Sequence, residues 1–294
     1  MNYFKHKKIT IIHRFVVFCM LNKKRRQNKH LRVKTHMNIS LHELGEAAVE
    51  FAKAGGDSTL NYFKKSFELE RKADQSPVTN ADREAETVIR EKIKKYFPDH
   101  GIIGEEYGKE NEHSEVVWIL DPIDGTKSFI HGIPFYTTLI GVLVQNKPEI
   151  GVIYAPALGE MVSAVTGGGC YLNGDPVKVR ECTGLAEATL LTTDVTSFET
   201  YGVQDAMKEL IAKTRLHRTW GDAYGHMMVA TGRADIMIDA VLNIWDAAAL
   251  MPIVTEAGGS YTDLYGNISI ETGSALSCNK LIRNEILNIF DKNK

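Results

Sequence analysis

The chain has 294 residues, of which 44% are hydrophobic and 24% charged, so it can form one large or two small domains with a sizeable core. Past residue 36 it has 24 basic and 37 acidic residues, and this negative body excludes unspecific binding of nucleic acid. The four cysteines are scattered without metal-ligand spacing, as is typical of reduced thiols in a cytosolic protein.

Residues 1–36 form a basic leader with eleven Lys or Arg residues and no Asp or Glu. Its apolar run, residues 9–21, is short and interrupted by His13 and Arg14, so it does not predict a transmembrane helix. The lack of a small-residue cleavage site makes it a poor signal peptide, and the lack of serine argues against a transit peptide. The leader is either a basic tail or an upstream extension before a working start at Met37, and we favour the extension.

Residues 40–65 predict a helix, because Ser40 can cap it and apolar residues recur at helical spacing. Residues 72–82 are polar and predict a loop, which leads into a second helix from Asp82 to residue 93. Residues 101–104 predict a short strand that ends at two glutamates.

Carboxylates at the end of a strand project into a crevice, which makes Glu105 and Glu106 candidate site residues. Residues 108–115 are charged and poorly patterned, and they predict a surface loop. Residues 116–120 form a continuous apolar run, which predicts a buried strand.

From residue 137 the pattern changes to an antiparallel meander, so the first half should be helices packed on a sheet. After residues 183–187 strands and helices alternate, which indicates helices layered on a second sheet. We therefore expect an α+β half over 37–185 and an α/β half over 186–294. The expected strands are 139–144, 150–154, 161–165, 189–192, 216–220, 236–238, 261–263 and 275–278, and the expected helices are 203–214, 222–231, 246–257 and 281–290.

The stretch after the buried strand carries the strongest chemical signal. Asp121 and Asp124 are separated by Pro122, which fixes the backbone between them. Gly125 allows a ligand to approach closely, and Thr126 can begin a helical turn whose free N–H groups suit a phosphate. The alternative is a solvated turn, but acidic residues recur elsewhere in the chain. The stretch therefore predicts oxygen ligands for a divalent cation beside an anion site.

Residues 121–129 resemble the metal-binding motif of the lithium-sensitive phosphatase superfamily, typified by inositol monophosphatase. Gly104-Glu105-Glu106, Trp245-Asp246 and Gly258-Gly259 match further pieces of its pattern in the same order, over roughly residues 40–290. The resemblance implies a layered αβαβα sandwich of the sugar-phosphatase type. It also implies a homodimer that acts on a small-molecule phosphate monoester. From the charge, the thiols and the interrupted apolar run described above, we expect a cytoplasmic protein that binds neither nucleic acid nor membrane.

Four carboxylates, of Glu105, Asp121, Asp124 and Asp246, come from separated segments, and all-oxygen ligation favours Mg²⁺ over Zn²⁺. The resemblance implies two or three ions. By it, Glu105, Asp121 and the carbonyl of Ile123 hold one ion, and Asp121, Asp124 and Asp246 hold a second. Two such ions clamp the attacking and leaving oxygens of an in-line displacement.

The resemblance implies direct attack of a metal-activated water on the phosphate, without a phosphoenzyme. By it, Glu105 and the Thr126–Asp82 pair orient and deprotonate the water, and the amides of Gly125 and Thr126 receive phosphate oxygens. A water held near Asp246 protonates the leaving alkoxide. Asp124 and Asp246 therefore also belong to the substrate-binding set.

Some of these residues have a plainer interpretation. Asp82 can be part of a helix cap at Thr79 or Asn80, and Lys72 can be a surface charge. We favour Asp82 as the partner of Thr126 and Lys72 as a cation near the metals. Trp245, by contrast, is expected to pack at a helix start rather than to stack on substrate.

Residues 220–226, Trp-Gly-Asp-Ala-Tyr-Gly-His, resemble the histidinol-phosphatase branch of the superfamily, although Ala223 stands where that branch has Cys or a similar small residue. The resemblance implies hydrolysis of L-histidinol phosphate to L-histidinol and phosphate, in histidine biosynthesis. Asp222, Tyr224 and Asp239 could supply acceptors and an aromatic wall for the ammonium and imidazole of the leaving group. The alternatives are a favourable helix-start charge for Asp222 and a turn for Asp239.

Two other functions stay open. One is an inositol-1-phosphate phosphatase or another sugar or nucleotide monophosphatase of the same superfamily. The other is a metal-dependent binding protein without catalysis, which would use the basic leader on RNA. The second predicts no turnover and a need for residues 1–36, and the complete carboxylate set argues against it.

Overall fold

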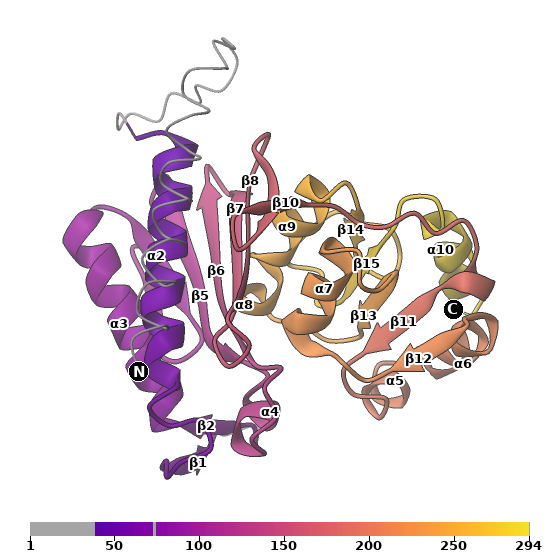
Figure 1. Cartoon of the computed structure of the whole chain (residues 1–294), viewed down its shortest axis with the longest axis horizontal. Helices are drawn as coiled ribbons and strands as arrows, with labels where there is room; N and C mark the ends of the chain where they lie inside the picture. Colours follow the sequence, from indigo (N-terminus) through magenta and orange to yellow (C-terminus); the bar gives the residue numbers. More distant parts are fainter. Residues whose placement is uncertain (1–38, 73–74, 294) are drawn as a thin grey trace, which may run out of the picture.

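The structure is a computed structural model that describes residues 39–72 and 75–293. The basic leader and the expected start at Met37 lie outside these residues. The described chain forms five layers, helices–sheet–helices–sheet–helices, which confirms the predicted αβαβα sandwich (Figure 1). No helix within the described ranges combines the length and apolar character needed to span a membrane.

An eight-stranded sheet forms the second layer. All neighbouring strands are antiparallel except β3 and β5, which run parallel. The antiparallel meander predicted from residue 137 is thus confirmed from β6 to β10, and β5 extends it, but the sheet as a whole is mixed. Its strands, in order across the sheet, are β10 (Asp175–Val177), β9 (Gly169–Leu172), β8 (Glu160–Val165), β7 (Lys147–Ala155), β6 (Thr137–Val144), β5 (Val116–Asp124), β3 (Gly101–Gly104) and β4 (Gly108–Glu110).

The surface loop expected over 108–115 is wrong at its start, because β4 pairs with β3 as a hairpin. The loop expected over 72–82 is also partly wrong, since a two-stranded hairpin forms from β1 (Leu69–Arg71) and β2 (Pro77–Thr79). Each of these two hairpins is held by backbone hydrogen bonds, which a polar stretch without a clear pattern can form as well as an apolar one.

The first helical layer consists of α2 (Leu41–Thr59) and α3 (Asn80–Tyr96), which cover one face of the large sheet (Figure 1). Ser40 caps α2 as predicted, although the helix ends before residue 65. Phe51, Ile89 and Trp118 are buried together between these helices and β5. Strand β5 is apolar on both faces because helices cover both, which explains its continuous apolar run.

The middle layer lies between the sheets and contains α7 (Asp222–Ala230), α8 (Ile244–Ala247) and α9 (Leu250–Glu256). A single helix over 246–257 is therefore wrong. Pro252 has no N–H to donate to the carbonyl of Ala248, and its ring would clash with that carbonyl in a continuous helix. A proline is tolerated in the first turn, so α9 begins afresh just before it.

A five-stranded sheet forms the fourth layer. Strand β11 lies parallel to both β12 and β13, whereas β15 lies antiparallel to β13 and β14. Its side chains alternate between two apolar clusters, with Leu191 and Met237 facing the middle helices and Leu190 and Ile236 facing the outer ones. The strands in order are β12 (Leu216–Arg218), β11 (Thr189–Thr192), β13 (Ile236–Asp239), β15 (Ala275–Cys278) and β14 (Ser260–Thr262).

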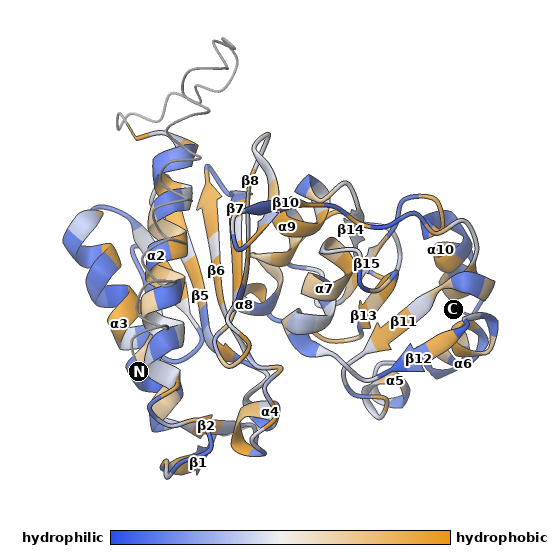
Figure 2. Cartoon of the chain, viewed as in Figure 1, coloured by the Kyte–Doolittle hydropathy of each residue, from blue (hydrophilic) through white to orange (hydrophobic). Residues whose placement is uncertain are grey.

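The last layer covers the outer face of the five-stranded sheet. Its apolar side chains, such as Leu210 and Phe290, pack on that sheet, and its outward faces are hydrophilic (Figure 2). The three cysteines of the described chain are free and buried, two of them in this cluster. The remaining helical elements of the described chain are α4 (Thr126–Ile130), the 3-10 turn η1 (Leu185–Glu187), α5 (Ser197–Thr200), α6 (Gln204–Lys213) and α10 (Arg283–Lys292).

Candidate active site

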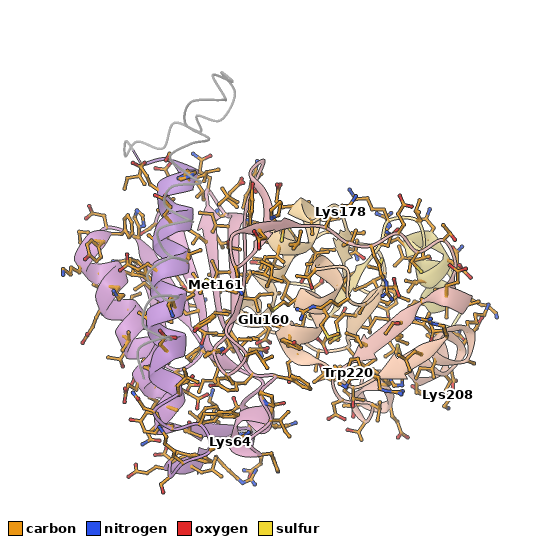
Figure 3. The ribbon with its side chains drawn as sticks, in the orientation of Figure 1. Lys64, Glu160, Met161, Lys178, Lys208 and Trp220 are labelled. Atoms are coloured by element: carbon orange, nitrogen blue, oxygen red, sulfur yellow. The ribbon has the colours of Figure 1, made fainter. Side chains whose placement is uncertain are left out.

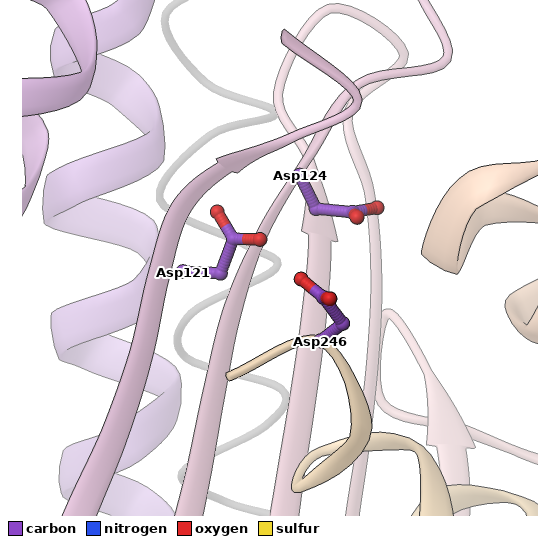
Figure 4. A group of neighbouring side chains, drawn as sticks. All are labelled: Asp121, Asp124 and Asp246. Carbon is purple, nitrogen blue, oxygen red and sulfur yellow. The ribbon is translucent and has the colours of Figure 1, made fainter. Parts of the chain in front are cut away.

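Three carboxylates meet at the end of β5. Asp121, Asp124 and Asp246 each offer an oxygen, and these oxygens lie within 4.8 Å of one another (Figure 4). In a regular strand, residues three apart point to opposite faces of the sheet. Here Asp121 pairs with Leu139 and Asp124 with Thr137, so two residues of β5 oppose one of β6. This bulge turns both carboxylates toward one site.

The third carboxylate comes from the short helix α8. The backbone N–H of Asn243 donates to Asp246 Oδ2 at 2.7 Å, and Asn243 in turn caps the helix with its side chain. This reciprocal capping fixes the rotamer of Asp246 while its other oxygen stays available. The neighbouring Trp245 is half-buried and packs with Ile244 against an apolar cluster under β5, as predicted for it.

The set of donors fits a hard divalent cation. Asp124 Oδ2 accepts from Thr137 Oγ1 at 3.2 Å and from the backbone N–H of Ala223 at 2.7 Å. Asp121 Oδ1 is buried and has no hydrogen-bond partner in residues 39–72 and 75–293. A buried carboxylate oxygen without a donor is costly unless a cation binds it.

The electrostatics of the group point the same way. Burial, and then repulsion from neighbouring carboxylates, raise the pKa of Asp121 and of Asp124 well above the usual range. Burial also raises the pKa of Asp246 to about 6, against hydrogen bonds from Asn243 and Asp121 that lower it. The site is therefore a concentration of negative charge that a cation would stabilise.

Glu105 lies at the end of β3 and outside the group of three. Its Oε1 contacts Lys72 Nζ at 2.7 Å, and the same ammonium contacts Glu106 Oε1 at 2.7 Å. Burial lowers the pKa of Lys72, but the hydrogen bonds to both glutamates outweigh it and the net shift is upward. Glu105 also raises the pKa of Asp121, so its charge acts on the group of three.

A buried ion pair that the sequence analysis did not single out holds this turn. Glu86 and Arg90 lie one helical turn apart on α3, with Arg90 Nε 2.7 Å from Glu86 Oε1. Glu86 also accepts the backbone N–H groups of Glu106 at 2.8 Å and Tyr107 at 3.2 Å. The spacing of an acid and a base four residues apart on a predicted helix was the available signal.

Asp82 caps a helix, as one interpretation of it expected, and it also lies near Thr126. Its Oδ2 accepts from the backbone N–H and the hydroxyl of Thr79, at 2.8 and 2.6 Å, and so caps α3, which begins two residues earlier than expected. Its Oδ1 lies 3.4 Å from Thr126 Oγ1. That hydroxyl also lies 3.1 Å from the carbonyl of Ile123, and its single proton can serve only one of them. Burial raises the pKa of Asp82 to about 6.

Gly125 precedes α4 with a φ of 79°, a conformation that favours glycine. A Cβ at this position would lie 2.8 Å from Asp222 Oδ2, so the backbone approaches that carboxylate closely. Asp222 itself has a φ of 53°, and burial raises its pKa to about 7, with further contributions from Asp239 and Asp246. The structure thus places Asp222 against the turn of Gly125 and Thr126.

Asp239 ends β13 and is buried. Its Oδ1 accepts from Thr193 Oγ1 at 2.5 Å, and its Oδ2 lies 3.1 Å from His226 Nε2. Its charge raises the pKa of Asp124 and of Asp222, so it lies near the group of three.

Tyr224 contributes differently from the two aspartates. Its ring stacks on Phe135 with centroids 5.0 Å apart. Its hydroxyl lies 3.4 Å from both Glu160 Oε2 and Arg233 Nη1. Glu160 begins β8, where the large sheet faces the second half of the chain (Figure 3). Glu160 and Arg233 form an ion pair, with Arg233 Nη1 2.8 Å from Glu160 Oε2. The hydroxyl of Tyr224 thus contacts this ion pair, whereas its ring stacks on Phe135.

Comparison with known proteins defines the class. The profile of the inositol monophosphatase family matches residues 40–293. A histidinol-phosphatase of Chlorobaculum parvum is 42% identical over 232 residues, which cover 79% of this chain and 90% of the relative. Inositol monophosphatase 2 of Solanum lycopersicum is 35% identical over 77% of this chain and 89% of its own.

A solved structure, the extragenic suppressor protein suhB of Bartonella henselae, superposes with a TM-score of 0.80 at 29% identity, over 85% of this chain and 98% of its own. The chain therefore belongs to the inositol monophosphatase family. It is a phosphatase of this family, and Asp121, Asp124 and Asp246 form a group that could bind a metal ion.

Replacing Glu86 by glutamine should destabilise the fold. The substitution leaves the Arg90 charge buried with less compensation, and breaking a buried ion pair costs about 3–5 kcal/mol. We expect the loss in the free energy of unfolding, measured by urea denaturation, to lie at the low end of this range. The reason is that Arg90 Nη1 retains its ion pair with Glu110 Oε1 at 2.9 Å. Glu91→Gln, at an exposed position on the same helix, is the control. Equal stability of the two variants would contradict the assigned role.

In a chelating buffer the protein should melt at a higher temperature at about pH 5.5 than at about pH 7.5. The folded-state pKa values of Asp82 and Asp246, about 6, and of Asp222, about 7, lie above the unfolded value near 4. At these carboxylates the native chain binds more protons than the unfolded chain in this window, so their contribution makes stability fall as pH rises.

Burial lowers the pKa of His100 and of His217, which opposes this effect of pH, but Asp121 and Asp124, whose pKa values are raised, add to it. Scanning calorimetry in EDTA measures the effect. A melting temperature that rises with pH across the window would refute it.

Proposed function

We propose that the protein is a Mg²⁺-dependent histidinol-phosphatase, which hydrolyses L-histidinol phosphate to L-histidinol and phosphate. The observation that carries the proposal is the pair Asp222 and Asp239, two carboxylates beyond those of the metal group. Asp222 lies against Gly125, and the charge of Asp239 acts on Asp222 and Asp124. Such a pair suits a phosphate ester whose alcohol carries an ammonium and an imidazole.

The name of the Chlorobaculum parvum relative supports the same substrate, as do histidinol-phosphatases of Mycobacterium tuberculosis and Streptomyces coelicolor at 34% and 32% identity. Three inositol monophosphatases of plants, at 33–35% identity, favour the second candidate, an inositol-phosphate phosphatase. The family resemblance leads us to expect a cytoplasmic homodimer in histidine biosynthesis.

Asp121, Asp124, Asp246 and Glu105, with the Ile123 carbonyl, would hold the Mg²⁺ ions. When bound, Mg²⁺ supplies positive charge to the phosphate and lowers the pKa of a water in the site. In the proposal, Thr126 Oγ1 orients the attacking water, and Asp82 accepts its proton through that hydroxyl. A pKa of about 6 suits Asp82 to this exchange near neutral pH.

The amides of Gly125 and Thr126 are proposed to receive phosphate oxygens. The αL turn at Gly125 leaves both N–H groups at the start of α4, next to the metal group. Glu105 is held by Lys72 until a cation competes for its carboxylate. The oxygen of the attacking water would bond to phosphorus while the bond from phosphorus to the ester oxygen breaks, and a second water held near Asp246 would give the leaving alkoxide its proton.

A phosphate-release panel with Mg²⁺ tests the substrate. It compares L-histidinol phosphate with inositol 1-phosphate, fructose 1,6-bisphosphate and adenosine 3′,5′-bisphosphate. We expect the highest kcat/KM for L-histidinol phosphate. Asp239→Asn should lower it roughly tenfold through KM, since a charge-assisted hydrogen bond is worth about 1.5–3 kcal/mol. A neutral ester should be barely affected. A preference of the wild type for inositol 1-phosphate would favour the second candidate.

Asp124→Asn should abolish Mg²⁺-dependent hydrolysis and raise the stability of the chelated protein. The substitution removes a ligand and also one of the repelling charges. Saturating Mg²⁺ at about 100 times its Kd should stabilise the wild type by about 2.7 kcal/mol and the variant far less. Thermal shift with and without Mg²⁺ measures both effects. Asp205→Asn, at an exposed position, should behave like the wild type. Retained activity in Asp124→Asn would overturn the metal assignment.

A further inference from the structure

A chain of buried hydrogen bonds runs behind the two leaving-group carboxylates. Ser277 Oγ lies 2.7 Å from His226 Nδ1, and His226 Nε2 lies 3.1 Å from Asp239 Oδ2. On the other side of Asp239, Thr193 Oγ1 donates to Oδ1 at 2.5 Å and accepts the backbone N–H of Asp222 at 2.7 Å. These hydrogen bonds therefore link β15, α7 and the residue that follows β11 to the Asp239 carboxylate on β13, and they return to the start of α7 at Asp222.

Donor and acceptor chemistry fixes the direction of each bond. An ionised carboxylate only accepts, so His226 Nε2 and Thr193 Oγ1 must both carry a proton toward Asp239. In the neutral imidazole, Nδ1 is then left as an acceptor for the hydroxyl of Ser277. Thr193 has used its one proton on Asp239, so its lone pair is free for the Asp222 amide. With a neutral imidazole and an ionised Asp239, this arrangement gives each of these hydrogen bonds one donor and one acceptor.

The two sides of Asp239 differ in their surroundings. His226 and Ser277 are fully buried, with exposed fractions of 0%, whereas Thr193 is half-buried. His226 sits on α7, the helix whose first turn supplies Asp222 and the Ala223 amide that binds Asp124. Asp222 has a left-handed φ of 53°, which is unusual for a residue with a Cβ, and its N–H bond to Thr193 helps to hold it there.

We infer that Thr193 and His226 are positioning residues for substrate specificity. They hold Asp239 from opposite sides, and through Thr193 also Asp222, in the arrangement that selects a phosphate ester with a cationic alcohol. This inference rests on the proposed function. It assigns a role to two residues that lie outside the metal group and the phosphate turn in the sequence, and whose side-chain hydrogen bonds within the described chain go to Asp239, Asp222 and Ser277. The role differs from packing because it acts on one class of substrate.

The test compares paired variants on two substrates. Thr193→Val and His226→Leu remove the donors to Asp239 while keeping the approximate shape. Thr193→Ser and His226→Gln keep a donor at nearly the same place. Each variant is assayed with Mg²⁺ on L-histidinol phosphate and on glycerol 2-phosphate, whose alcohol is neutral. Thr262→Val is the control, because Thr262 is a buried threonine whose Oγ1 has no hydrogen-bond partner among the described residues.

We expect Thr193→Val and His226→Leu to lower the ratio of kcat/KM for the cationic over the neutral ester about tenfold, through KM. The kcat for glycerol 2-phosphate should stay within about twofold of the wild type, since the phosphate chemistry is untouched. Thr193→Ser and His226→Gln should recover most of the ratio, and Thr262→Val should keep it. Binding of the product L-histidinol, measured by calorimetry, should weaken in the same order.

Three results would count against the inference. An unchanged ratio in folded Thr193→Val and His226→Leu overturns it while leaving the proposed function intact. An equal loss on both substrates assigns the two residues to general stability and also overturns it. A wild type without preference for the cationic ester overturns the proposed function itself. If the His226→Leu variant does not fold, the comparison of Thr193→Val with Thr193→Ser, at a half-buried position, tests the inference by the same ratio of kcat/KM values.

Discussion

Mutual repulsion among buried carboxylates is the constraint on which the rest of this structure depends. Asp121, Asp124 and Asp246 lie within reach of one ion, and Asp121 is buried and the other two half-buried, where charge is screened less well than in water. Hydrophobic packing on both faces of β5 must outweigh this cost in the absence of a cation. The apolar run before Asp121 therefore both forms the core and carries the site at its end.

The surrounding groups orient these carboxylates without neutralising them. Thr137 and the Ala223 amide bind Asp124, and the Asn243 amide binds Asp246. Neutral donors of this kind fix rotamers while leaving the negative charge for a metal. Because Ala223 belongs to the second half of the chain and Asp124 to the first, both sheets must be in place before the site is complete.

Lys72 and Arg90 are cationic side chains on the periphery of the site. Lys72 binds Glu105 and Glu106, and Arg90 binds Glu86 behind the same turn. Glu86 also accepts hydrogen bonds from the backbone N–H groups of the turn that carries Glu106. On the opposite side, the chain from Ser277 to Thr193 holds Asp239 and Asp222. Hydrogen bonds thus hold both the metal group and the pair Asp222 and Asp239, as the proposed catalysis by preorganised charge would require.

The sequence by itself determined the chemistry and the class of fold. Acidic residues after apolar runs, with Gly125 and Thr126 behind them, were enough to indicate a metal and phosphate site, because strand ends present side chains to solvent. Local patterns also located most strands and helices. They failed where pairing partners or a backbone clash decided the outcome, as in the β3–β4 hairpin and at Pro252.

Only the tertiary structure decided how the site is assembled. Residues three apart on a strand should face opposite ways, and it took the bulge opposite β6 to bring Asp121 and Asp124 together. No local pattern connects Thr193, His226 and Ser277 to Asp239, since they come from separate elements that meet only after both sheets pack on α7. The reason is physical: residue type sets what a side chain can bind, whereas the distance between remote segments is set by packing.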